Sequence, residues 1–251
     1  WCCLVGSEMC IRDSAESVTV EIQGNAENLT AIDLDASVTN INLNGKAGVI
    51  LDMGNIGTRS ITAGGGSYLV RDAATNLTSI DLTAAPNNNP NATSVTAVVA
   101  GDSEDLTGVD LDSDVGAIDL NGKSGVLMDA GNAHNRVITK NGGTYTITDT
   151  ATNLSNGNFD KAGGSDDADS VTVEIQGNAE DLRAIDFDAT VTNINLNGKA
   201  GVVMDAANAN GIVITKNGGS YTISDNSTNL SDGNFDKAGL SEDADLSLIH
   251  I

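Results

Sequence analysis

Short stretches in which every second residue is apolar recur along the chain, as at Ile32/Leu34 and Val49/Leu51. Alternation over about four to six residues is typical of a strand with one buried face. The stretches are separated by Asn-Gly, Gly-Gly and similar pairs, which tolerate positive φ and favour turns. Strand and turn recurring about every ten residues predict an all-β fold.

The chain also repeats itself on a longer scale. Residues 18–49 and 171–202 are nearly identical, and 95–126 are a looser copy, so the copies start 77 and 76 residues apart. Repeat architectures bury their core between neighbouring units. We therefore predict three repeats, with boundaries at 14–94, 95–170 and 171–245.

Two arrangements of such strands compete, a parallel β-solenoid and a series of tandem small β-sandwich domains. The solenoid is favoured because aromatic residues are only 3% of the chain, and a sandwich usually needs a larger aromatic centre. Asn40, Asn42 and Asn44 suit ladders of stacked amides between coils. Occasional one-turn helices are expected at corners, one of them at 26–32 behind Asn25 as N-cap. Both prolines lie in 84–94, which predicts an exposed loop there.

Charge and hydropathy exclude two kinds of partner. The 251 residues carry 12 Lys and Arg against 35 Asp and Glu, a formal charge of −23. Nucleic acid binding needs clustered cations, so no nucleic acid partner is predicted. No apolar run approaches the roughly 18 residues of a membrane span, so none is predicted either.

The two ends differ in character from the repeats. One back-translation of residues 246–251, read as its reverse complement, encodes Met9–Asp13. This pairing resembles the transposase-end adapter of shotgun sequencing libraries. We therefore interpret 1–13 and 246–251 as adapter-derived and the rest as a metagenomic fragment of a longer protein. All three cysteines lie within 1–13, so the repeats have no disulfide or thiolate metal site. The apolar residues of 246–251 suit pairing along an open sheet edge.

Phrases within the repeats, such as residues 145–154 and 191–196, resemble tandem repeats of very large bacterial surface and secreted proteins. That group includes adhesins and the calcium-dependent proteins of the RTX type. The resemblance implies export to the extracellular space or cell surface, a structural or adhesive role, and calcium. The RTX signature G-G-x-G-x-D is absent, because Gly142-Gly143 is followed by Thr144 and Tyr145.

The strongest candidate for a metal site is Asp110, Asp112 and Asp114. At alternate positions of a strand they would share one face and offer the hard oxygen ligands that calcium prefers. The competing interpretation places them at solvated outward positions between buried Val109 and Leu111. We commit to no metal ligand and no other cofactor, and keep calcium as a candidate.

The favoured function is a structural or adhesive rod or stalk within a longer exported surface protein. Its partners would be the neighbouring repeats and a cell-surface or glycan ligand. The first alternative is a calcium-binding secreted repeat protein, and the second a polysaccharide-active β-helix enzyme using paired carboxylates. Catalytic sites are normally singular, whereas these acidic pairs recur in every copy, and His134 is the one histidine outside the end segments. No enzymatic activity is therefore predicted.

Overall fold

The computed structural model describes residues 17–57, 59–78, 92–155, 159, 167–231, 244 and 246–250, the last five by their backbone alone. It divides into two compact units. The first comprises Trp1–Val98 and Leu111–Ala117, and the second Val99–Asp110 and Ile118–Ile251. The end segment 1–13 lies outside the described residues, as does most of the loop expected at 84–94.

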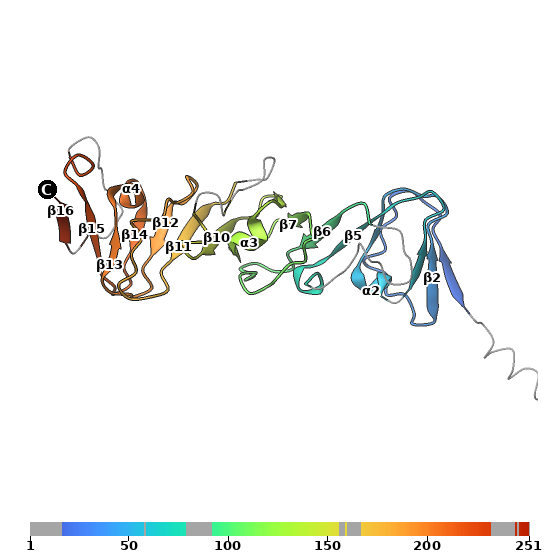
Figure 1. Cartoon of the computed structure of the whole chain (residues 1–251). Coiled ribbons are helices and arrows are strands. Elements are labelled where there is room, and N and C mark those ends of the chain that lie inside the picture. The colour runs from blue at the N-terminus through green and yellow to red at the C-terminus, as the bar shows by residue number, and fades with distance from the viewer. Residues whose placement is uncertain are drawn as a thin grey trace, which may run out of the picture. The chain divides into compact units, whose positions relative to one another are not determined.

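Parallel sheets build the first unit (Figure 1). One sheet has the strand order β1-β2-β4, and in the other β5 lies between β3 and β6. Its elements are β1 (Val18–Glu21), β2 (Val38–Asn42), β3 (Val49–Leu51), the one-turn helix α2 (Met53–Ile56), β4 (Ser60–Thr62), β5 (Tyr68–Ala73), the 3-10 turn η1 (Ala74–Asn76) and β6 (Val95–Val98).

The second unit repeats this organisation. One of its sheets has the order β14-β12-β11-β10-β8, another has the order β13-β15-β16, and β7 pairs with β9. The elements are β7 (Ala117–Asp119, the last two residues in this unit), β8 (Val126–Met128), α3 (Ala130–Ala133), β9 (Val137–Thr139), β10 (Tyr145–Asp149), β11 (Ser170–Glu174), β12 (Asn193–Asn195), β13 (Val202–Met204), α4 (Ala206–Ala209), β14 (Val213–Thr215), β15 (Tyr221–Asn226) and β16 (Leu246–His250).

Neighbouring strands of one sheet are a full coil apart in sequence. Val20 pairs with Ile41 and Ile41 with Ile61, all in parallel, and the second unit shows the same spacing. A tight hairpin cannot join parallel strands, so the chain crosses to the opposite sheet and returns, which is the path of a solenoid. The predicted all-β parallel β-solenoid is confirmed. The alternative of β-sandwich domains, which are built from antiparallel sheets, is wrong.

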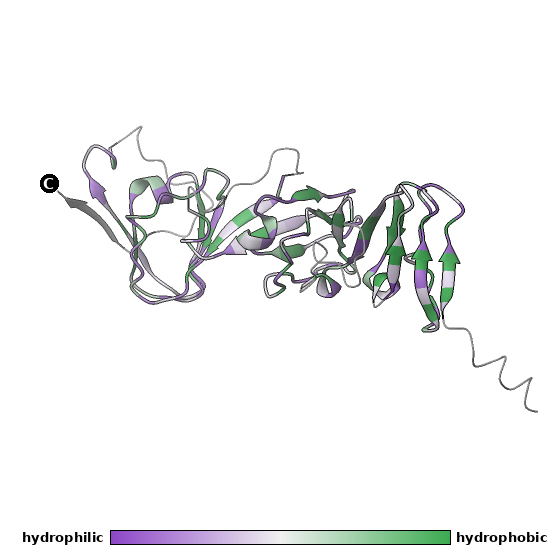
Figure 2. Ribbon diagram, turned by 45° about the vertical axis from the view of Figure 1, so that its right-hand side comes forward, coloured by the Kyte–Doolittle hydropathy of each residue, from purple (hydrophilic) through white to green (hydrophobic). Residues whose placement is uncertain are grey.

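The core consists of the inward-facing residues of successive coils. Ile41, Val49, Leu51 and Val70 are fully buried, and Tyr68 is exposed by only 1%. Hydrophobic residues alternate with paler or purple ones along the strands in Figure 2. Burying each such side chain stabilises the fold by about 1.5–3 kcal/mol, before the entropy of ordering the chain is counted.

The one-turn helices exist, but the corner chosen for one from the sequence is wrong. Residues 26–32 form turns around an isolated bridge from Asn28 to Ile50, and Ala26 adopts φ 53°, in the left-handed region. The Asn25 side chain does not cap its own segment, since its Oδ1 accepts from the Ala47 N–H at 3.0 Å on the adjacent coil. The Ile32/Leu34 stretch is likewise not a strand, and Ile32 is 47% exposed. The helices lie one corner further along each repeat.

Glycine allows the coils to approach closely at the Gly-Gly turns. A Cβ placed on Gly66, Gly143 or Gly219 would lie 2.2, 2.0 or 2.3 Å from the carbonyl oxygen of Lys46, Lys123 or Lys199. No side chain fits at such distances. These turns therefore fix the coil spacing by backbone contact.

The asparagine ladders differ from the expected stack of amides. Asn42 and Asn44 donate to the Glu21 carboxylate of the adjacent coil, and Asn195 and Asn197 donate to Glu174 in the same way. An amide–amide bond does occur between Asn217 Nδ2 and Asn195 Oδ1, at 2.8 Å. Acceptor-only carboxylates suit the amide N–H donors, so much of the ladder pairs amides with carboxylates.

β16 comprises the first five residues of the second end segment. It pairs in parallel with β15, with Thr222 opposite Leu246 and Asn226 opposite His250. The pairing expected for this segment along an open sheet edge is therefore found.

Candidate functional site at the helical corner

Among the described residues, a one-turn α-helix follows a strand at the same corner of each repeat. Asp52, Asp129 and Asp205 are the N-caps of α2, α3 and α4, and their carboxylates accept from the backbone N–H three residues on at 2.6, 2.7 and 2.8 Å. Aspartate satisfies one of the free N–H groups that begin a helix. The sequence Asp-x-x-Asn thus starts the helix in all three copies.

A second carboxylate reaches the same helix from the next coil. Asp72 accepts from the Met53 N–H at 2.8 Å, Asp149 from Ala130 at 3.0 Å, and Asp225 from Ala206 at 3.1 Å. Each corner therefore holds two aspartates from consecutive coils.

The N-cap carboxyls of the second unit are electrostatically strained by this arrangement. Burial raises the pKa of Asp129, and the nearby Asp149 and Asp110 raise it further. Burial likewise raises the pKa of Asp205, with further contributions from Asp225 and Asp186. Both causes disfavour the charged form.

A buried asparagine joins each corner to the preceding coil. Asn55 donates from Nδ2 to the Leu29 carbonyl at 2.8 Å, and Asn132 donates to Leu106 at 2.8 Å and Val109 at 2.6 Å. Asn208 makes the same two bonds, to Leu182 and Ile185, both at 2.8 Å. These three side chains are 2, 3 and 4% exposed, so their bonds form in a largely water-free environment.

In the first two repeats an arginine fills the space behind the helix. The Arg59 guanidinium donates to five backbone carbonyls, those of Leu34, Asp35, Val38, Gly54 and Asn55. Arg136 donates to the carbonyls of Gly131 and Asn132 at 2.7 and 3.1 Å. Five N–H donors in a rigid plane make arginine suited to such a position. The corresponding residue of the third repeat is Ile212.

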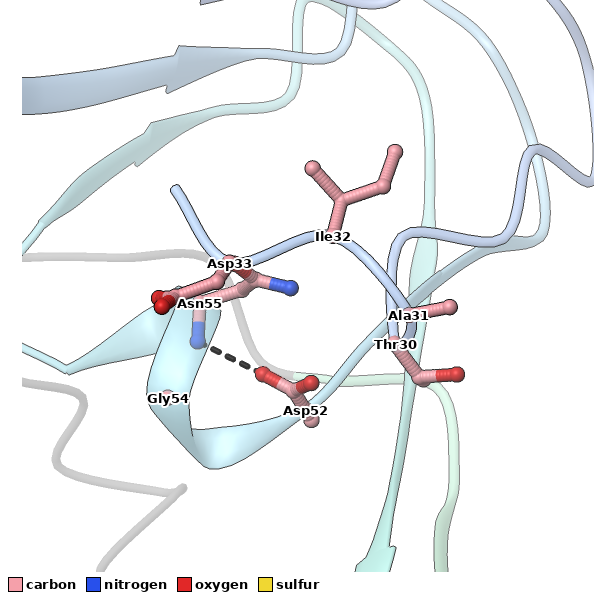
Figure 3. A pocket seen from close by; sticks show the side chains of 7 residues that line it. All are labelled: Thr30, Ala31, Ile32, Asp33, Asp52, Gly54 and Asn55. Carbon is pink, nitrogen blue, oxygen red and sulfur yellow. Dashed lines mark hydrogen bonds between the residues drawn. The ribbon is translucent and has the colours of Figure 1, made fainter. Parts of the chain in front are cut away.

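Beside α2 the corner is hollowed. The hollow has a volume of about 280 Å³ and is lined by Thr30, Ala31, Ile32, Asp33, Asp52, Gly54 and Asn55. Figure 3 shows the Asp52 carboxylate bonded to Asn55, and Ile32 directed away from it. The Thr30 hydroxyl donates to Asn28 Oδ1 at 2.9 Å. This lining offers carboxylates and carbonyl groups, which accept hydrogen bonds and attract cations, and its hydroxyl is already engaged.

The structure does not place the sequence-predicted calcium candidates on a strand. Asp110–Asp114 form a loop and turn, in which Asp112 Oδ1 accepts from the Asp114 N–H at 2.9 Å. Asp110 belongs to the second unit, where its charge helps to raise the pKa of Asp129. Asp112 and Asp114 belong to the first unit. In the described parts of the chain, no group of three or more His, Cys, Asp or Glu side chains is arranged to hold a metal ion.

The buried Asn and Arg residues of the corner were missed in the sequence analysis. Their signal was present as the repeated spacing of Asp, Asn and Arg, at Asp52/Asn55/Arg59 and again at Asp129/Asn132/Arg136. Aligning the repeats position by position would have found it.

Within the described residues, no helix is long and apolar enough to cross a membrane. In comparisons with known proteins, the chain matches no protein-family model, no curated protein and no solved structure.

Proposed function

We propose that this chain is a structural or adhesive repeat module, a rod or stalk segment within a longer exported bacterial surface protein, and that it has no catalytic centre. A fold alone does not define a function, so the proposal depends on what the polar residues do. Its resemblance to repeats of large surface and secreted proteins supports the exported location.

The observation that carries the proposal is the repetition of bonds between coils. Asn55, Asn132 and Asn208 make the same bond to the coil before, and the paired aspartates make the same bond to the helix in all three repeats. Among the described residues, no buried side-chain nitrogen or oxygen lacks a hydrogen-bond partner. The buried polar groups therefore hold coil to coil, which is what a load-carrying stalk needs.

A lengthened chain tests the structural role. Duplicating residues 95–170 should lengthen the particle by roughly 17 Å at unchanged cross-section, since a coil of about 21 residues adds about 4.8 Å. Small-angle X-ray scattering measures both quantities. A flexible, beaded profile, or a growing cross-section, would contradict the proposal.

The adhesive part of the proposal needs its own measurement. Binding of the chain to immobilised bacterial and host glycans, compared with the duplicated chain, distinguishes a ligand-binding module from a spacer. Saturable binding that increases with repeat number supports adhesion. Absence of binding leaves the spacer role and removes the adhesive one.

A further inference from the structure

The third repeat has a hollow where the other repeats have an arginine. Its volume is about 420 Å³, and its lining includes Phe187, Asp188, Val191, Ala207, Asn208 and Ile212. This volume is within the range of small-molecule sites.

The first repeat shows what fits there. Arg59 corresponds to Ile212, 153 residues later, and its five carbonyl acceptors correspond to five residues of the hollow. The acceptors are Leu34 at 2.7 Å, Asp35 at 3.2 Å, Val38 at 3.1 Å, Gly54 at 2.7 Å and Asn55 at 3.1 Å. Their counterparts are Phe187, Asp188, Val191, Ala207 and Asn208.

The second repeat uses the same position. Arg136 donates to the Gly131 and Asn132 carbonyls, at the distances that Arg59 has to Gly54 and Asn55. Ala207 and Asn208 are the matching residues of the third repeat. Two independent copies therefore give the same position for a guanidinium.

We propose that the hollow beside Ile212 binds a guanidinium group supplied by a separate molecule, in the position that Arg59 and Arg136 fill in their own repeats. The ligand class is a guanidinium cation, either free or at the end of an arginine side chain. The Ile212 side chain has no N–H group, so it cannot supply the hydrogen bonds that Arg59 and Arg136 donate in their own repeats. This inference does not depend on the proposed stalk role.

Charge and shape both favour this ligand. Asp186 and Asp188 line the hollow. In the first repeat, hydrogen bonds from Ser37 are the main cause that lowers the pKa of Asp35, and the charge of Arg59 is the smallest one; Asp188 is the corresponding residue of the third repeat. A planar fork of N–H donors reaches several carbonyls at once, which a compact ammonium group cannot do.

Guanidinium chloride serves as the probe in an NMR titration of the full chain, up to about 50 mM at constant ionic strength. We expect saturable amide shifts confined to residues 186–192 and 206–212, with a dissociation constant of about 1–10 mM, as suits a ligand of four heavy atoms. Urea and methylammonium are the controls for shape and for charge. Shifts that do not saturate, or that either control reproduces, would falsify the proposal.

Two variants test the position independently. Ile212→Arg should abolish the guanidinium shifts at the third repeat and raise the melting temperature by several degrees, because the chain then supplies its own donor. Arg59→Ala should create a second site, with new guanidinium-dependent shifts at residues 33–39 and 53–57. Guanidinium shifts that persist unchanged in Ile212→Arg overturn the assignment, even if Arg59→Ala does not fold.

The source of the guanidinium is settled by a second ligand. N-acetyl-arginine amide that binds at least as tightly as guanidinium identifies an arginine side chain as the natural occupant. Binding of guanidinium alone supports the site and restricts it to the small ion.

Discussion

Replacing Asn132 with alanine should destabilise the second unit strongly. The Nδ2 group of Asn132 donates to the Leu106 and Val109 carbonyls at 2.8 and 2.6 Å, and the side chain is 3% exposed. Alanine leaves the Val109 carbonyl without this donor, at about 1–3 kcal/mol, whereas the Leu106 carbonyl keeps its bond from the Val109 N–H at 3.0 Å and loses about 0.5–1.5 kcal/mol. We therefore expect a loss of about 1.5–4.5 kcal/mol. Asn55→Ala removes a bond to the Leu29 carbonyl, which keeps its bond from the Ile32 N–H, and should cost about 0.5–1.5 kcal/mol.

Urea unfolding followed by circular dichroism measures these losses. The matched control is Asn153→Ala, which removes an exposed bond to the Asp149 carboxylate and should cost under about 1 kcal/mol. If Asn132→Ala costs no more than this control, the buried amide does not join the coils and the argument fails.

Asn132→Asp separates the hydrogen bond from the shape of the side chain. At neutral pH the new carboxylate has no N–H donor and faces two carbonyl oxygens, so the loss should equal or exceed that of alanine. Burial would raise the pKa of this carboxyl, and its protonated form can donate. Part of the stability should therefore return as the pH falls. A loss that is independent of pH would contradict this account.

Three further predictions concern the turns, the N-caps and calcium. Gly143→Ala places a Cβ 2.0 Å from the Lys123 carbonyl oxygen and should lower the free energy of urea unfolding by about 3 kcal/mol. The control is Gly177→Ala, whose Cβ would have no atom within 4 Å and which should cost under about 1 kcal/mol. Equal losses would contradict the close approach of the coils. Asp129→Asn keeps the N-cap acceptor but cannot ionise. Because burial raises the pKa of Asp129 in the folded state, the native chain should lose stability relative to this variant as the pH rises from about 3.8 to 7. A stability difference that stays constant with pH would refute the assignment. Calcium at about 5 mM and constant ionic strength should leave the melting temperature within about 1 °C, whereas a large rise would establish the calcium-binding alternative.

Periodicity predicted the solenoid because buried residues alternate along many of the strands and the Asn-Gly and Gly-Gly turns recur at fixed positions. Val49/Leu51 and Tyr68/Val70 were identified in this way, and all four are buried. A pattern two residues long needs no tertiary information, which is why it was sufficient here.

The corner could not be predicted in the same way because its polar residues act on distant backbone. Asn55 can be buried because its amide donates a hydrogen bond to the Leu29 carbonyl, 26 residues earlier. Arg59 can be buried because its guanidinium donates to five backbone carbonyls on two coils. Composition assigns such residues to the surface. A helix of four residues is also too short to show a helical period.

The calcium hypothesis depended on a misleading alternation. Val109 and Leu111 around Asp110 suggested a strand, but the Asp112 side chain bonds to the backbone two residues on and forms a turn. Aspartate favours such local bonds, which compete with strand pairing.

The aspartates that cap a helix from the following coil impose an order on biosynthesis. Asp149 accepts a hydrogen bond from the N–H of Ala130, which lies 19 residues earlier. Asp72 and Asp225 accept in the same way from Met53 and Ala206. Because a ribosome adds residues from the N-terminus onward, each corner is completed only after the next coil has emerged. A chain that folds from its N-terminus would thus leave its newest corner incomplete until the next coil is added.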